Sequence, residues 1–208
     1  MRRAPVAIFL SVVATAAGLT ACGDSSSGSS PAPPPGTAAA APPAGSPAEA
    51  HVGPGCGSVP ASGPGSFEGM ASDPVVTAAA DNPILTRFAD AVRKANLVDT
   101  FNNARDITVF APANSAFEQL PASTIDHMTS DNATLSRILT YHAVNRRVAP
   151  AELSAGNFVS LEGATVSTSG SGQKLMINGN TAVVCGNIRT ANATVYIIDS
   201  LLKPPSSP

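Results

Sequence analysis

The chain has 208 residues, of which 43% are hydrophobic and only 12% are charged, and its formal net charge is −2. This length is sufficient for one sizeable domain with accessory segments. The basic residues are scattered along the chain, which argues against a nucleic-acid-binding protein. Ten of the 19 prolines fall between Gly23 and Ser66, so the chain combines two different kinds of segment.

The first 21 residues are predicted to be an export signal. Arg2 and Arg3 form a positively charged start, and residues 6–19 are an apolar run too short to span a membrane comfortably. The run ends in Leu19-Thr20-Ala21-Cys22, which resembles the bacterial lipoprotein box, in which the cysteine becomes the lipidated first residue. We therefore expect Cys22 to anchor the exported protein to the outer face of the cell membrane. An ordinary secretory signal that leaves Cys22 as a spare thiol is the alternative, and release of part of the protein without lipid stays open.

The three cysteines need an explanation in an exported protein, because an odd number leaves one unpaired. If lipid modifies Cys22, then Cys56 and Cys185 remain as a single pair that an oxidising compartment allows to form a disulfide. Closing a loop of roughly 130 residues would stabilise the fold by at most about 4–5 kcal/mol. Two unpaired buried thiols are the alternative. Neither cysteine is accompanied by a cluster of histidines or acids, so we expect no metal site and no cofactor.

Residues 22–66 are predicted to form a disordered tether. The segment is rich in Ser, then in Pro and Ala, and up to Gly55 its only charges are Asp24 and Glu49. Such a composition cannot bury enough apolar surface to fold. We place the folded domain at residues 67–205 and a short tail at residues 206–208.

The first part of the domain carries the signals of short helices. Asp73-Pro74 and Asn82-Pro83 each predict a helix start. Leu85, Phe88 and Val92 then recur at helical spacing, which predicts one buried helix face. Later in the chain, a helix is predicted from Ser130-Asp131 onward, and its buried face is formed by four residues at positions i, i+3, i+4 and i+7: Leu135, Ile138, Leu139 and His142.

A strand and a helix meet abruptly in the middle of the chain. Residues 107–111 alternate in the manner of a strand, and Pro112 ends it because proline has no N–H to donate. Asn114 is predicted to cap the helix that follows through its side-chain oxygen. The rest of the chain is organised around this joint.

From Phe158 onward the apolar residues recur with a period of two, which predicts successive strands. Asn178-Gly179 indicates a tight hairpin of type I′, because both positions tolerate positive φ. Helices first and strands later predict an α+β fold, with N-terminal helices packed on a largely antiparallel β-sheet wedge.

Three segments resemble the motifs of the fasciclin-like domain family, in the order in which that family has them. Residues 108–117 (Thr-Val-Phe-Ala-Pro-Ala-Asn-Ser-Ala-Phe) resemble its first long motif, Tyr141-His142 its short tyrosine-histidine motif, and residues 194–202 its second long motif. The resemblance covers roughly residues 71–204. Within the family, the signal, tether and paired cysteines look most like the fasciclin-domain surface lipoprotein antigens of mycobacteria and their relatives.

The resemblance implies a module for adhesion and extracellular recognition, and it gives four candidate partner-binding residues. An Asp-Ile segment of some animal members matches Asn187 and Ile188, so the isoleucine is kept and the carboxylate is lost. Tyr141 and His142 match a motif that is discussed as structural support with a debated adhesive role. From its helical spacing, we expect His142 to point inward.

No motif in the sequence predicts catalysis. Gly-x-Ser-x-Gly and His-Glu-x-x-His are absent, and so are a phosphate-binding glycine loop and a dinucleotide fingerprint. We therefore expect a lipid-anchored module, not an enzyme, that binds a protein or glycan of a host cell or of the envelope. A carrier of a lipid or other apolar small molecule is one alternative. A secreted hydrolase that uses His142 is another.

Overall fold

The structure is a computed structural model that describes residues 50–205. The predicted signal peptide, Cys22, most of the predicted tether and the tail at residues 206–208 lie outside the described residues. Within residues 50–205, no helix is both long and apolar enough to cross a membrane.

Seven strands form one sheet in the order β2-β1-β7-β6-β5-β4-β3. Their bounds are β1 Ile107–Pro112, β2 Ala143–Val144, β3 Ala155–Val159, β4 Thr165–Ser171, β5 Lys174–Ile177, β6 Thr181–Arg189 and β7 Ala193–Ile198. All neighbours are antiparallel except β1 and β7, which run parallel next to the edge strand β2. The predicted α+β class with a largely antiparallel sheet is confirmed.

The sheet curls until its two outer strands meet. Val144, in β2, forms an antiparallel bridge to Ser160, directly after β3. The N–H of Leu161 also donates a 2.7 Å hydrogen bond to the carbonyl of Ala143. The two edges of the sheet therefore pair with each other at one end, which protects backbone groups that an open edge would expose.

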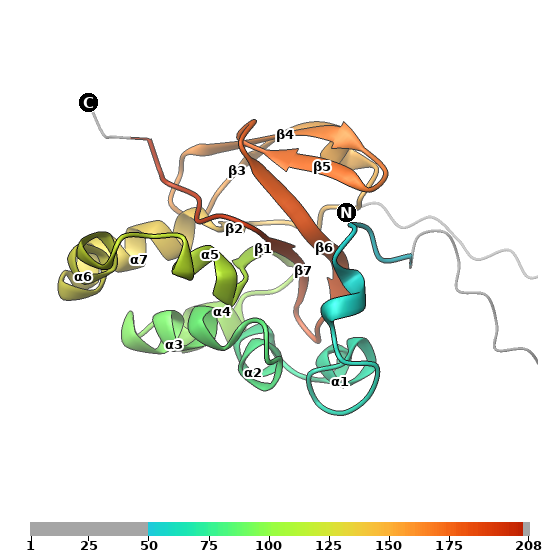
Figure 1. Cartoon of the computed structure of the whole chain (residues 1–208), viewed down its shortest axis with the longest axis horizontal. Coiled ribbons are helices and arrows are strands. Elements are labelled where there is room, and N and C mark those ends of the chain that lie inside the picture. Colours follow the sequence, from blue (N-terminus) through green and yellow to red (C-terminus); the bar gives the residue numbers. More distant parts are fainter. Residues whose placement is uncertain (1–49, 206–208) are drawn as a thin grey trace, which may run out of the picture. The chain divides into compact units, whose positions relative to one another are not determined.

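Within residues 50–205, seven α-helices and two short 3₁₀ helices accompany the sheet. Their bounds are η2 Cys56–Ser58, α1 Phe67–Ser72, α2 Val75–Asp81, α3 Thr86–Lys94, α4 Val98–Asn103, α5 Asn114–Glu118, α6 Ala122–Ser130, α7 Asn132–Tyr141 and η3 Glu152–Ser154. Figure 1 shows the α-helices gathered on one side of β1 and β7, with β3, β4 and β5 on the other side.

Strands β1 and β7 separate two hydrophobic cores, because successive side chains of a strand point to opposite faces. Val109 of β1 and Val195 of β7 lie in the core shared with the helices. Phe110 and Tyr196, which follow them in sequence, lie in a second core enclosed by the curled sheet. All four side chains are fully buried.

Three helix starts have no side-chain hydrogen bond from their own N-cap residue, and for the helix after β1 this corrects the predicted cap by Asn114. The N-cap Pro74 of α2 provides no side-chain hydrogen bond, and neither does Leu85 at the start of α3. Asparagines from elsewhere replace them: Asn192 and Asn102 accept from the first N–H groups of α2. Asn114, predicted to cap its own helix, instead accepts from the N–H of Arg87 in α3 at 3.0 Å.

Strand β6 is continuous, but its register with β7 shifts between Val183 and Cys185 and again between Cys185 and Ile188. The second shift lies at Gly186-Asn187, where Asn187 has a φ of 61°. A Cβ at Gly186 would lie 2.2 Å from the Tyr196 ring, so only glycine fits there. The Asn178-Gly179 turn is as predicted, since both residues have positive φ.

The folded domain begins earlier than Phe67, where the sequence placed its boundary. Cys56 and Cys185 form the expected disulfide bond. Val52 pairs with Gly186 through two backbone hydrogen bonds of 3.2 and 2.6 Å. His51 stacks on Phe67 with ring centroids 3.6 Å apart. Residues 50–66 are therefore part of the domain, because the disulfide and the β6 irregularity hold them against the sheet.

Candidate functional site

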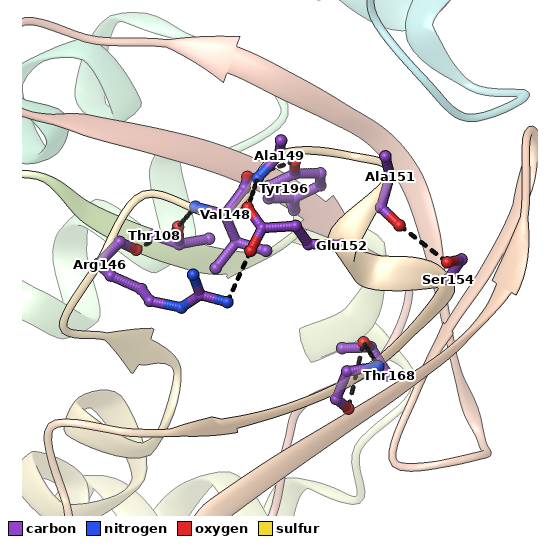
Figure 2. A network of polar contacts seen from close by, with 10 residues as sticks. Thr108, Arg146, Val148, Ala149, Ala151, Glu152, Ser154, Thr168 and Tyr196 are labelled. Carbon is purple, nitrogen blue, oxygen red and sulfur yellow. Dashed lines mark hydrogen bonds and ion pairs between the residues drawn. The ribbon is translucent and has the colours of Figure 1, made fainter.

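The connection between β2 and η3, residues 145–151, is held in place by hydrogen bonds to buried side chains of the sheet (Figure 2). Thr108 of β1 donates from Oγ1 to the carbonyl of Arg146 at 2.7 Å and accepts from the N–H of Val148 at 2.9 Å. Tyr196 of β7 donates its hydroxyl to the carbonyl of Val148 at 2.8 Å. Burial raises the pKa of the Tyr196 hydroxyl, so it remains a neutral donor. The loop is therefore positioned rather than free.

Glu152 closes this loop on its outer side. Its Oε1 accepts from the N–H of Ala149 at 3.1 Å, and its Oε2 lies 2.8 Å from Nη2 of Arg146. The Ala149 hydrogen bond, followed by the Arg146 guanidinium, lowers the pKa of the Glu152 carboxyl. The Arg146 guanidinium in turn lies 4.9 Å from the centre of the Phe158 ring.

An open hollow of about 650 Å³ lies beside this loop, between the loop, the end of β6 and the start of β7. We call it the arginine hollow and define it by its ten lining residues: Arg147, Glu152, Asn187, Arg189, Thr190 and Thr194, with Ala71, Val148, Ala149 and Ala191.

Two contacts orient the Arg147 side chain at the hollow. Its Nε lies 2.8 Å from Oδ1 of Asp106, and its Nη1 donates to the carbonyl of Ala193 at 3.2 Å. Arg189, the last residue of β6, is exposed and brings a second guanidinium to the same hollow.

Asn187 and Ile188 point in opposite directions from the sheet. Asn187 lines the arginine hollow with only 7% of its surface exposed, and its Nδ2 donates to the carbonyl of Ala50 at 3.1 Å. Ile188 is fully buried in the core under the helices. The prediction that Ile188 contacts a partner is therefore corrected, because a side chain without exposed surface cannot do so. For Asn187 partner contact stays a prediction.

Tyr141 and His142 are corrected in the same way, because both side chains are buried. The Tyr141 hydroxyl donates to the carbonyl of Thr165 and accepts from Nδ2 of Asn178, both at 3.0 Å. His142 donates from Nδ1 to the carbonyl of Ile138 at 2.8 Å and accepts at Nε2 from the N–H of Leu202 at 3.0 Å. These residues support the fold from inside it.

His142 also cannot serve as the base of the hydrolase alternative. Both ring nitrogens are engaged with the backbone, and burial lowers the pKa of the imidazole to about 4. Over residues 50–205, no three His, Cys, Asp or Glu side chains come together in a group that could hold a metal ion.

The carrier alternative places an apolar ligand between the helices and the sheet. In that region Phe88, Phe101 and Ile107 are fully buried and belong to one cluster of packed side chains.

The sequence did not predict the arginine hollow. Its residues come from positions 71, 147–152 and 187–194. The last two segments meet because β1 pairs on one side with β2, which precedes residues 147–152, and on the other side with β7, which follows the β6–β7 turn. The signal in the sequence is the Arg146-Arg147 doublet, which by itself does not distinguish a site from solvated surface.

A family model and two relatives from mycobacteria match the chain, and a solved structure shows a weaker likeness. A family model described as Fasciclin domain matches residues 83–204. The chain is 48% identical to the immunogenic protein MPB70 of Mycobacterium bovis over 163 residues, which are 74% of this chain and 83% of that protein. It is 45% identical to the cell surface glycolipoprotein MPB83 of the same species over 168 residues, 77% of this chain and 75% of that protein. A solved FAS1 domain pair from the insect cell adhesion molecule Fasciclin I matches with a TM-score of 0.46 and 20% identity, over 60% of this chain and 46% of that chain.

Proposed function

Because the chain belongs to the fasciclin domain family, we propose that it is a surface-displayed recognition module that binds a protein or glycan partner through the arginine hollow. The observation that carries this proposal is the hollow itself. It is open, it is lined by polar groups, and its walls are fixed by hydrogen bonds to the central strands. Binding sites gain affinity when their groups are held in place before the partner arrives.

Display at the cell surface is the second part of the proposal. The relative MPB83 is named a cell surface glycolipoprotein, and the present chain carries Cys22 at the end of its apolar leader. A lipid on Cys22 and the Pro/Ala-rich segment that follows would hold the domain at an average distance of about 30 Å from the membrane if the segment behaves as a flexible coil. Mass spectrometry of the membrane-extracted protein tests this. A diacylated or triacylated Cys22 is expected, and an unmodified thiol would remove the anchor from the proposal.

The module is proposed to act without catalysis. The arginine hollow brings together arginines, Glu152, Asn187 and two threonines, and its lining contains no histidine or cysteine. Glu152 is engaged by Arg146 and by the N–H of Ala149, so it is placed to fix the loop and not to accept a proton from a substrate.

A binding assay with a charge-reversed hollow tests the proposed function. The exported chain from Gly23 onward, fixed to beads, is offered to cultured host cells and to isolated envelopes of the source organism. We expect saturable binding to one of the two surfaces and at least a tenfold loss in Arg189→Glu. Arg93→Glu is the matched control, because Arg93 is also exposed, lies on α3 and is not among the residues of the hollow. Equal binding by Arg189→Glu and wild type would place the binding surface elsewhere.

A further inference from the structure

We propose that the outer edge of β3 binds an extended, uncharged peptide segment of a partner protein, which adds to the sheet as a further strand. This second site goes beyond the proposed function, because the residues that line it are not among those that line the arginine hollow. The inference follows from three features: backbone groups of β3 that point away from β4, a hollow beside them, and an uncharged strand with an exposed valine.

The hydrogen-bonding pattern of the sheet turns every second residue of β3 away from β4. Ser167 of β4 uses its backbone toward β5: its carbonyl accepts from the N–H of Asn178 at 2.8 Å, and its N–H donates to Oδ1 of Asn178 at 3.0 Å. Asn157 lies opposite Ser167, so this pair is not hydrogen-bonded and the N–H and C=O of Asn157 point outward. The N–H of Val159 points outward by the same alternation. Within residues 50–205, no hydrogen bond joins these three groups to another residue.

The next outward group of this series shows that the edge can pair. Leu161 donates its N–H to the carbonyl of Ala143 in β2 at 2.7 Å. The pairing stops because the chain turns away from β3 after Val144. The N–H of Arg146 donates back to the carbonyl of Val144 at 2.9 Å, and Thr108 of β1 holds the carbonyl of Arg146. The part of β3 that precedes this junction therefore keeps an open edge, where a longer β2 would have run.

A hollow of about 530 Å³ lies beside this open edge, and we call it the seam hollow. It is lined by residues 144–146 on the side of β2 and by residues 157–161 on the side of β3. A strand that pairs with Asn157 would lie about 4.8 Å from β3, with residues 145–146 as a second wall behind it. A strand within a second folded copy brings its own neighbouring strand and would meet this wall. A peptide segment without such neighbours is the occupant that fits.

The edge lacks the features that usually keep exposed strands from pairing, which are charged side chains and proline. Residues 155–161 contain neither. Val159 is 62% exposed and is the one exposed large apolar side chain within residues 50–205. The acids that flank the strand in sequence, Glu152 and Glu162, are held in ion pairs of 2.8 and 2.7 Å. A charged segment would find no opposite charge along β3, so electrostatic complementarity selects an uncharged segment with apolar side chains.

The test follows the amides of the exported chain from Gly23 onward by nuclear magnetic resonance while an acetylated peptide Thr-Val-Thr-Val-Thr is added. We expect shifts of the Asn157 and Val159 amides, with a dissociation constant of about 1 mM or below. Directly opposed residues share one face of a sheet, so a peptide valine that contacts Val159 must turn its own N–H toward β3. N-methylation of the two valines should therefore abolish binding, and N-methylation of the threonines should leave it.

Three protein variants locate the site. Asn157→Pro removes an outward donor and keeps the β4 ladder, and it should weaken binding at least fivefold. Its thermal midpoint is measured beside it. Val159→Lys should also weaken binding, because a charge at the edge opposes strand addition. Ser169→Lys is the matched control, since Ser169 is an exposed residue of the neighbouring β4 and does not line the seam hollow. Arg189→Glu, the variant of the arginine hollow, should leave peptide binding unchanged.

Four results would overturn the inference. Binding that survives N-methylation of the valines would show an apolar contact without strand pairing. Equal binding by wild type, Asn157→Pro and Val159→Lys would place the peptide elsewhere. No amide shifts at a peptide concentration of about 5 mM would remove the site. Shifts of Asn157 and Val159 that appear on raising the protein concentration without peptide, together with slower tumbling, would assign the edge to a second copy of the chain.

Discussion

The side chain of Asn192 accepts a hydrogen bond from the backbone N–H of Val75 at 2.9 Å, although 117 residues separate the two in sequence. The Nδ2 of the same amide donates to the carbonyls of Phe101, Asn102 and Ala104, at 2.7, 3.2 and 2.8 Å. One asparagine in the β6–β7 turn thus caps the start of α2 and the end of α4. It joins the helical layer to the turn that forms one wall of the arginine hollow.

Asn192→Ala should therefore destabilise the domain strongly. Removing the amide takes away one acceptor and two N–H donors that serve one N–H and three carbonyl groups at helix ends, and each of these three hydrogen bonds contributes about 1 kcal/mol. We expect a loss of about 3 kcal/mol in the free energy of unfolding, measured by urea denaturation. Asn103→Ala is the control, since Asn103 is exposed, and it should change stability by less than about 0.5 kcal/mol. A small effect at Asn192 would mean that solvent replaces its contacts.

The disulfide should stabilise the whole domain and also hold its N-terminal end in place. Cys56 and Cys185 are 129 residues apart, so removing the bond frees a long loop in the unfolded chain. Cys56→Ser with Cys185→Ser should lower the free energy of unfolding by at most about 4–5 kcal/mol. Hydrogen exchange at Val52 and Gly186, which pair beside the bond, should accelerate before exchange at Val109 in the central strand. Simultaneous acceleration at all three would show that residues 50–56 do not open separately.

Acid should destabilise the protein through His142. Burial holds the folded-state pKa near 4, whereas the ordinary value is 6.5, so the unfolded chain binds a proton that the folded one excludes. The stabilisation is complete above pH 6.5 and is lost as the pH falls from 6.5 toward 4, by about 3 kcal/mol in total. Protonation would also place an N–H at Nε2 against the N–H of Leu202.

The comparison variant for this prediction is His142→Gln, which cannot titrate. Its stability should be lower than that of wild type at pH 7.5, and it should fall less steeply between pH 6.5 and 4.5. Partial burial also lowers the pKa of His51, which is present in both proteins. The contribution of His142 is therefore the difference between wild type and His142→Gln in the slope of unfolding free energy against pH. Equal slopes would contradict the assignment to His142.

Local sequence signals predicted the elements but not the contacts between them. The alternation at residues 107–111 and the four-residue face ending at His142 depend on neighbours in sequence, and both appear as predicted. The predicted helix cap was wrong because the asparagines that cap these helices come from distant segments. Asn114, for example, accepts a hydrogen bond from the N–H of Arg87 in α3 and not from its own helix. The hollow was missed for the same reason. Burial of Ile188, Tyr141 and His142 shows that a family motif can mark the core as readily as a surface.

Gly186→Ala should disturb the arginine hollow from inside the sheet. The new Cβ would lie 2.2 Å from Cδ1 of the Tyr196 ring, which is buried and cannot move without breaking its hydrogen bond to Val148. We expect a loss of about 2–3 kcal/mol, as for other overpacked cores. Tyr196→Phe is the matched variant, because it keeps the ring and removes the hydroxyl, and it should cost about 1 kcal/mol. Both should weaken partner binding through the loop, measured at a temperature where each variant is folded. Unchanged binding in both would show that the loop holds its position without Tyr196.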